Sequence, residues 1–143
     1  MLFHSDRISL RTSARIEILD ITDRIRNVFD RNRIQNGQMT ICSTHTTAFV
    51  ALNESEPLLQ RDMVDFLTAL VPCDATTYRH NLNPVDGRPN AHSHLLGLFM
   101  NASETILVSN GELLLGDWQS IFFIELDGPR EERTLRVQLA GER

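Results

Sequence analysis

Histidines and hydroxyl residues gather in the middle of the chain, where they could bind a metal ion or move protons. Four of the five histidines lie between residues 45 and 94. His45 stands among threonines in 43-STHTTA-48, and 90-NAHSH-94 contains two more histidines. One such histidine alone can equally be a hydrogen-bonded structural residue. The grouping of the rings, together with Glu54, Asp62 and Asp86, is what predicts a site.

His92 and His94 are spaced so that both could reach one metal ion. If residues 92–94 are extended, the two rings project from the same face of the chain, while His45 and His80 approach from other segments. Imidazole nitrogens bind zinc at about 2.0–2.1 Å, whereas a mixture with carboxylates suits manganese or magnesium better. The spacing therefore indicates a divalent metal ion without identifying it, and an H-x-H pair by itself is a weak signal.

Two other chemistries compete with the metal hypothesis. Cys42 lies three residues before His45, but no cysteine-protease motif surrounds the pair, so nucleophilic catalysis is the weaker hypothesis. Arg88 and Arg130 follow Gly or Pro turns in 86-DGRP-89 and 128-GPR-130, where they could contact an anion or be ordinary turn residues. All fourteen basic residues are Arg, which excludes lysine Schiff bases and the Walker-type phosphate loop.

The segments that must position these residues switch between the two-residue period of strands and the longer period of helices. The expected elements, in order, are a strand or broken pair of strands at 8–19, a helix from 20 that ends at 36–37, strands at 38–42 and 49–52, a second helix from 55, a long loop at 71–93, a hairpin at 104–115, and strands at 118–126 and 134–139.

Both helices carry recognisable start signals. Asp20 is the predicted cap of the first helix, whose apolar positions recur at Ile21, Ile25, Val28 and Phe29. Ser55 is the predicted cap of the second helix and Pro57 lies in its first turn. The apolar face expected for that second helix consists of Leu59, Met63, Phe66 and Leu70.

The C-terminal third gives the clearest strand pattern. Asn110-Gly111 between two apolar runs is a strong hairpin signal. Residues 118–126 are almost continuously apolar, which predicts a strand buried on both faces, and Trp118 is expected in the core or at a subunit contact. The chain is therefore predicted to be α+β, a strand-rich, mainly antiparallel core covered by two helices in a single domain, 1–143.

Composition restricts the partners. The net charge is −5 and the sequence pI is near 5.5, so a nucleic acid partner is not expected. No apolar run reaches the roughly 18 residues of a membrane span, and the first residues lack a signal-peptide pattern. We therefore expect no membrane partner and a cytoplasmic location, with Cys42 and Cys73 as free thiols.

Several of these strings resemble the YjbQ-like family of small proteins, also described as secondary thiamine-phosphate synthases. They are 45-HTTAFVALNE-54, Asp62, 80-HN-81, 90-NAHSHL-95 and 111-GELLLGDWQSIFFIELDGPR-130. The resemblance covers most of the chain and is strongest from His45 to Leu139. Two positions depart from the family pattern: His92 stands where members often have Asp, and Asn101 stands where Gly is usual.

The resemblance implies a compact, strand-rich fold assembled as a homotrimer. Carried over by motif, it implies that His45, His80 and His94 are metal ligands. It also implies that Glu54 or Asp62 acts as base or orients the ligands. The departure at His92 puts the role of that position, and the metal preference, in question.

The reaction implied by the resemblance joins an aminopyrimidine diphosphate to a thiazole phosphate and releases pyrophosphate. It needs stabilisation of leaving-group charge and no protein nucleophile. Magnesium prefers oxygen ligands, so a histidine-rich site indicates that this transferase activity is secondary to another metal-dependent one. The alternative to an enzyme acting on a small phosphorylated or heterocyclic substrate is a non-catalytic trimeric module that binds a metabolite or anion.

Overall fold

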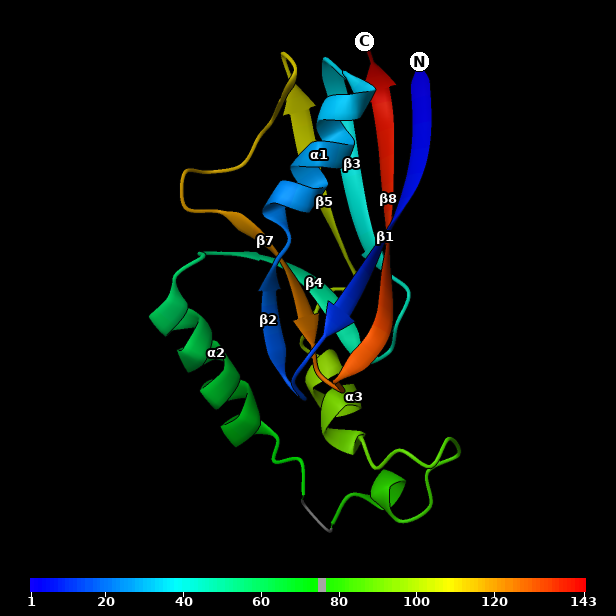
Figure 1. Cartoon of the computed structure of the whole chain (residues 1–143), viewed down its shortest axis with the longest axis vertical. Helices are drawn as coiled ribbons and strands as arrows, with labels where there is room; N and C mark the ends of the chain where they lie inside the picture. Colours follow the sequence, from blue (N-terminus) through cyan, green and yellow to red (C-terminus); the bar gives the residue numbers. More distant parts are fainter. Residues whose placement is uncertain (75–76) are drawn as a thin grey trace.

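The computed structural model describes residues 1–74 and 77–143, which form two antiparallel sheets with helices packed around them (Figure 1). The elements in chain order are β1 (Leu2–Thr12), β2 (Glu17–Asp20), α1 (Thr22–Asn32), β3 (Asn36–Ser43), β4 (Ala48–Asn53), α2 (Pro57–Leu70), the 3₁₀ turn η1 (Arg79–Asn81), α3 (Ala91–Gly97), β5 (Ser103–Ser109), β6 (Glu112–Leu113), β7 (Ser120–Glu125) and β8 (Arg130–Glu142). Among the described residues, no helix has the length and apolar content needed to cross a membrane.

The larger sheet has the strand order β1-β8-β3-β5-β6, and α1 lies across it. The predicted apolar positions of α1, among them Ile25 and Val28, are buried in one cluster with Met39 and Ile41 of β3 and Leu135 of β8. Removing each of these side chains from water contributes about 1.5–3 kcal/mol to folding. The first core is therefore a helix packed on an antiparallel sheet, as the α+β prediction required.

The smaller sheet, β2-β7-β4, divides the interior into two cores. Successive side chains of a strand face opposite sides, so Ile121 and Phe123 of β7 pack into the first core. Phe122 and Ile124 pack into a second core that also contains Leu67 of α2, among other residues. The prediction that this segment is buried on both faces is confirmed.

Helix α1 ends earlier than predicted, and α2 is turned differently. Arg33 adopts a left-handed conformation (φ 52°) and ends α1 after Asn32, so the Asn36-Gly37 pair begins β3 instead of ending the helix. On α2 the buried residue is Leu67, while the predicted core residue Phe66 is 63% exposed. Its cap is Glu56, which accepts from the amides of Leu58 and Leu59, and not Ser55.

The segment expected to be one long loop contains a third α-helix. Helix α3 begins at Ala91 and includes His92 and His94, so these residues are helical and not extended. Residues two apart on a helix point in widely different directions, unlike those of a strand. The condition under which both rings could reach one metal ion, an extended conformation of residues 92–94, is therefore not met. Trp118 also lies outside β7 and is 77% exposed, which excludes the core within one chain.

Candidate functional site

His80 and His94 meet where η1 packs against α3. Their ring centroids are 5.1 Å apart and the rings are nearly perpendicular, at 84°. Both rings line a cavity of about 710 Å³, together with Tyr78, Arg79 and Leu95. His80 is exposed and His94 half-buried, so this pair, which we call the His80–His94 pair, is accessible to a small molecule.

The His80 ring is fixed by a buried asparagine. Nε2 of His80 lies 2.8 Å from Oδ1 of Asn90, and Nδ2 of Asn90 donates to Oδ2 of Asp127 over 2.7 Å. Asn90 directly precedes α3, while Asp127 follows β7, so the link connects the helix to the end of the smaller sheet. Asn81 supports the same junction, because its Oδ1 accepts from the Ala91 amide (3.0 Å).

Asp127 binds both turn arginines, Arg88 and Arg130, for which the sequence allowed either an anion contact or an ordinary place in a turn. Arg88 donates to both of its carboxylate oxygens (2.9 and 3.0 Å), and Arg130 donates to Oδ2 (2.9 Å). Burial alone would raise the pKa of Asp127, but hydrogen bonds from Arg88, Asn90 and Arg130 lower it to about 2. We call Arg88, Asp127 and Arg130 the Asp127 cluster. It carries two positive charges and one negative.

His45 occupies a different environment from the pair. It follows β3, and its Nε2 lies 3.0 Å from the backbone nitrogen and 3.1 Å from the carbonyl oxygen of Thr134. Burial and the nearby Arg133 lower the pKa of His45. The Cys42 thiol points to the Ser43 carbonyl, so the contacts of Cys42 give no support to a cysteine–histidine nucleophile. Cys42 and Cys73 are free, as predicted.

His92, the departure from the family pattern, is a core residue. Its Nε2 lies 2.9 Å from the Leu126 carbonyl oxygen, which accepts, so Nε2 carries the proton. Its Nδ1 is buried without a hydrogen-bond partner among the described residues. Burial lowers the pKa of His92 because a charged ring is poorly solvated there. His92 does not line the cavity of the His80–His94 pair, and it lines an adjoining cavity of about 640 Å³ that also includes Arg88 and Asp127.

The predicted acids lie apart from the histidine pair within one chain. Glu54 is exposed after β4, and Asp62 is exposed on α2. Neither lines the cavity of the His80–His94 pair. Across residues 1–74 and 77–143, no group of three His, Cys, Asp or Glu side chains is placed to hold a metal ion. Of the three predicted metal ligands, the structure therefore brings His80 and His94 together, and His45 lies apart from them.

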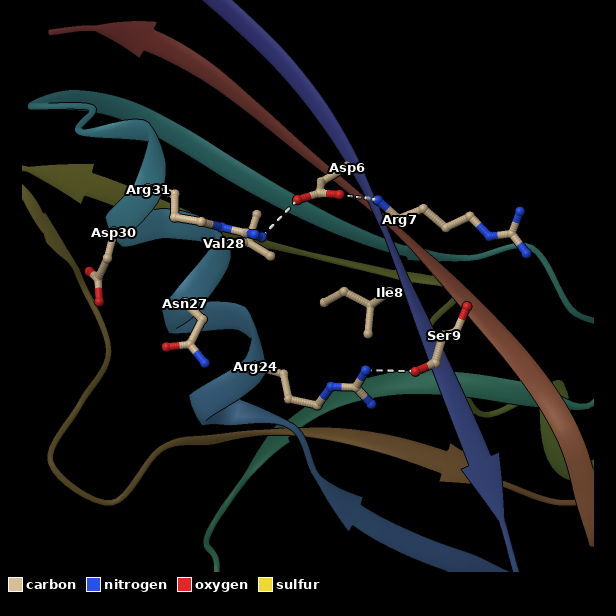
Figure 2. A pocket seen from close by; sticks show the side chains of 9 residues that line it. All are labelled: Asp6, Arg7, Ile8, Ser9, Arg24, Asn27, Val28, Asp30 and Arg31. Carbon is tan, nitrogen blue, oxygen red and sulfur yellow. Dashed lines mark hydrogen bonds and ion pairs between the residues drawn. The ribbon is translucent and has the colours of Figure 1, made fainter.

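A second cavity, of about 510 Å³, lies between β1 and α1 (Figure 2). Arg24 and Arg31 point into it from α1, but Arg24 donates to the Ser9 carbonyl (2.6 Å) and Arg31 pairs with Asp6 (3.1 Å). It contains none of the residues predicted for a site. These contacts tie α1 to the free edge of β1, and we do not place the candidate site there.

Known proteins share the sequence motifs of this chain. The model of the family described as UPF0047 protein YjbQ-like matches residues 6–142. The chain belongs to this family. A UPF0047 protein of Methanothermobacter thermautotrophicus is 42% identical over 99% of this chain and 95% of its own length. YugU of Bacillus subtilis is 33% identical over 94% of this chain and 97% of its own length.

A solved structure shows the same fold. The crystal structure of a YbjQ-like protein of unknown function from Sulfolobus solfataricus superposes with a TM-score of 0.91, at 35% identity, over 99% of both chains. The α+β prediction is therefore confirmed, with a correction from two helices to three. The YjbQ-like family resemblance drawn from the histidine and G-x-L-x-L-G-x-W-Q motifs is confirmed as well.

The residues of this YjbQ-like site that sequence reasoning missed are the ones that connect its parts. Asn90 and Asp127 lie inside the longer motifs 90–95 and 111–130, and neither was predicted for the site. The one signal for Asp127 is its place at the end of a continuous apolar strand and three residues before an arginine. That position predicts that the Asp127 carboxylate is buried. It does not predict that Arg88, 39 residues earlier, forms an ion pair with it.

Proposed function

We propose that this YjbQ-like protein is an enzyme whose site is the cavity at the His80–His94 pair. Its substrates are small phosphorylated heterocycles, and the reaction joins an aminopyrimidine diphosphate to a thiazole phosphate as a secondary activity of the site. The observation that supports the proposal is the meeting of two imidazole rings on the wall of an open cavity, linked through Asn90 to the positively charged Asp127 cluster.

The charges suit a phosphorylated substrate. In the proposed step, the thiazole ring nitrogen attacks the carbon that carries the diphosphate, and the C–O bond breaks to release pyrophosphate. Arg88 and Arg130 are 39% and 30% exposed and share the carboxylate of Asp127, while the charges of Asp86 and Glu125 also act on Arg88. Arg88 and Asp127 line the adjoining cavity of about 640 Å³ and not the cavity of the pair. In this proposal the diphosphate therefore extends from the pair into the adjoining cavity, where the guanidinium groups can stabilise the negative charge that develops on it.

The His80–His94 pair also supplies two imidazole ligands of the kind that zinc or manganese accepts. A divalent ion, when bound, would offset further charge on the diphosphate. The residues fit such an ion in part, because two imidazoles leave the other positions to water, substrate or a second subunit. The metal-ligand role of His45 and the catalytic role of Glu54 or Asp62 stay predictions, and both require a neighbouring subunit to bring these residues to this cavity.

Thiamine phosphate formation from the two substrates tests the proposal. His94→Ala should lower the rate about 100-fold, because one of the two rings at the reacting centre is lost. His4→Ala is the matched control, since His4 lies near the N-terminal end of β1, far from α3 in Figure 1. An equally low rate in the wild type and His94→Ala would reject catalysis at this pair.

Metal content gives a separate measurement. Untagged protein analysed for metals before and after chelation should contain a divalent metal that falls in His80→Ala and His94→Ala but not in His4→Ala. Active protein without metal would reject the metal part of the proposal and leave the transferase part standing.

We also propose the homotrimer, on the basis of large apolar side chains left in water. Phe66 and Leu70 of α2 are 63% and 51% exposed, and Phe99 and Trp118 are more than three-quarters exposed. Such groups on the surface of a chain indicate contact with another protein surface. Light scattering should give three times the chain mass, and the mass of one chain would reject the assembly.

A binding module is the second candidate, favoured by the two partly exposed guanidinium groups of the Asp127 cluster, which could bind an anion without any reaction. Calorimetry with inorganic pyrophosphate distinguishes it from the enzyme. Binding that is weakened by Arg88→Met, with no turnover in any variant, would support the module.

A further inference from the structure

The Asn90 side chain is the only direct connection that the described residues show between the His80 ring and the Asp127 cluster. It is 4% exposed, and it uses both ends of its amide: Oδ1 toward His80 Nε2 (2.8 Å) and Nδ2 toward Asp127 Oδ2 (2.7 Å). Each end of an amide has a fixed role, since the oxygen accepts and the NH₂ group donates. The orientation of Asn90 therefore determines what His80 must offer.

Asp127 sets that orientation. Its carboxylate is ionised near neutral pH, with a pKa of about 2, and can only accept hydrogen bonds. Turning the Asn90 amide over would place two oxygens against each other in a buried position, and would cost the hydrogen bond to a charged group as well. The NH₂ group of Asn90 therefore stays on Asp127, and Oδ1 stays on His80.

We propose that Asn90, anchored by Asp127, is a positioning residue that keeps the proton of neutral His80 on Nε2 and leaves Nδ1 as the free lone pair at the cavity. Nδ1 is then the ring atom that takes a proton or binds a metal ion, while Nε2 is committed to Asn90. A partner on one ring nitrogen that fixes the role of the other is a common device around catalytic and metal-binding histidines.

The positioning role rests on the proposed function, whereas the position of the proton does not. The two can be separated by nitrogen NMR of the histidine rings, which requires no substrate. In the wild-type protein at pH 8, His80 should show a protonated Nε2 and an unprotonated Nδ1. A ring with the proton on Nδ1 would overturn the inference.

Asn90→Leu tests the cause, because leucine has a similar volume and neither hydrogen-bonding group. Exchange of the Nε2 proton with water should become about fivefold faster or more, the effect of losing one hydrogen bond, and a share of the rings should move the proton to Nδ1. Asn81→Leu is the matched control, since it removes a different side-chain bond to the start of α3 and leaves the His80 bond in place. Unchanged His80 nitrogens in a folded Asn90→Leu, or an equal change in Asn81→Leu, would overturn the role of Asn90.

Zinc added to the wild-type protein then separates the two proposals. A shift confined to Nδ1 of His80, with the Nε2 proton retained, supports the positioning role. A shift of Nε2 with loss of its proton overturns it. If zinc leaves both ring nitrogens of His80 unchanged, zinc does not bind at the pair, and the proposal that Asn90 positions His80 for a metal ion is rejected. The wild-type and Asn90→Leu spectra still decide which ring nitrogen carries the proton. Should either variant fail to fold, the wild-type spectrum alone decides that position.

Discussion

Two buried carboxylates near the end of β7, Glu125 and Asp127, lie two residues apart and have different surroundings. Glu125 is fully buried and accepts from Arg133, Thr12 and the Asp127 amide. Its arginine partner is also buried, at 4% exposed. Asp127 instead binds two arginines that reach solvent, and Asn90 connects it to His80. Hydrogen bonds from arginine lower the pKa of both acids, although burial alone would raise it.

The difference indicates that the hydrogen bonds around Glu125, which we call the Glu125 cluster, stabilise the fold, whereas the Asp127 cluster positions the site. The side-chain partners of Glu125 are Thr12 of β1 and Arg133 of β8, so its hydrogen bonds join strands of the two sheets, and the backbone amide of Asp127 adds a third bond. Two partners of Asp127, Arg88 and Asn90, come from the long segment between α2 and α3, and the third, Arg130, is the first residue of β8. Substitutions at Glu125 should therefore change stability without changing His80, whereas those at Asp127 should change both.

Arg133→Met should give the largest effect. It leaves the Glu125 carboxylate buried without its charged partner, and breaking a buried ion pair in this way costs about 3–5 kcal/mol. Unfolding in urea, followed by circular dichroism, measures the loss. Arg136→Met is the matched control: Arg136 lies on the same strand but is exposed, so its loss should stay within about 0.5 kcal/mol.

The double variant Glu125→Met/Arg133→Met sharpens this prediction. Replacing both charges by apolar side chains removes the unpaired buried carboxylate, so the double variant should be more stable than Arg133→Met alone. If the double variant is the less stable of the two, the cost does not come from an unpaired charge. If Arg133→Met alters the His80 ring nitrogens more than Asp127→Asn does, the division between the two clusters is wrong.

Asp127→Asn should cost less and should depend on pH. The pKa of Asp127 is lowered from 3.8 to about 2 in the folded chain, which corresponds to about 2 kcal/mol of stability at neutral pH. A lowered pKa stabilises the folded state above the unfolded value, and that contribution is lost as the pH falls from about 4 through 2. The stability difference between wild type and variant should therefore be about 2 kcal/mol at pH 6 and should shrink toward pH 2. A difference that stays constant over this range would contradict the role of the ionised carboxylate.

Much of the fold could be predicted from the sequence because its signals are local. The two-sided burial of β7 follows from a continuous apolar run, and the turn at Asn110-Gly111 follows from two residues that adopt positive φ (51° and 76°). The ends and faces of the helices were predicted less well. Arg33 stops α1 in a left-handed conformation that a non-glycine residue rarely signals, and α2 turns Leu67 inward because of what it packs against.

The site was harder to predict because contacts distant in sequence create it. The histidine motifs identified His80 and His94, but the His80 ring is fixed by Asn90, which is itself held by Asp127, 37 residues away. The helical conformation of His92 and His94 also arises from packing, since residues 90–97 have no strong helix signal and Asn90 makes no side-chain cap bond. Spacing alone could not show that these two neighbours point to different places.

His92 offers a smaller, pH-dependent effect that comes from packing alone. Its pKa is lowered by burial in the folded chain, so the unfolded chain takes up a proton that the folded chain resists. Stability should therefore fall as the pH drops below about 6.5. His92→Leu should be within about 1 kcal/mol of wild type at pH 7.5, because Ser93 Oγ still donates to the Leu126 carbonyl (2.6 Å). It should also flatten the dependence between pH 7.5 and 5.5.

Urea unfolding at these two pH values provides the measurement. Some dependence should persist in His92→Leu, because the pKa of His45 is lowered as well. An unchanged slope in His92→Leu would show that the buried ring does not resist protonation.

The exposed pair of Arg11 and Glu131 should give the smallest effect and sets the baseline for both buried acids. Its atoms are 3.3 Å apart, and the two side chains are 74% and 86% exposed, so water and salt screen the attraction. Arg11→Ala should change the free energy of unfolding by less than about 0.5 kcal/mol, and 0.5 M salt should remove what remains. If Arg11→Ala instead lowered the free energy of unfolding as much as Asp127→Asn does, an exposed ion pair would stabilise the fold as much as a buried carboxylate. Burial and shared partners would then not explain the stabilising effect of Glu125 and Asp127.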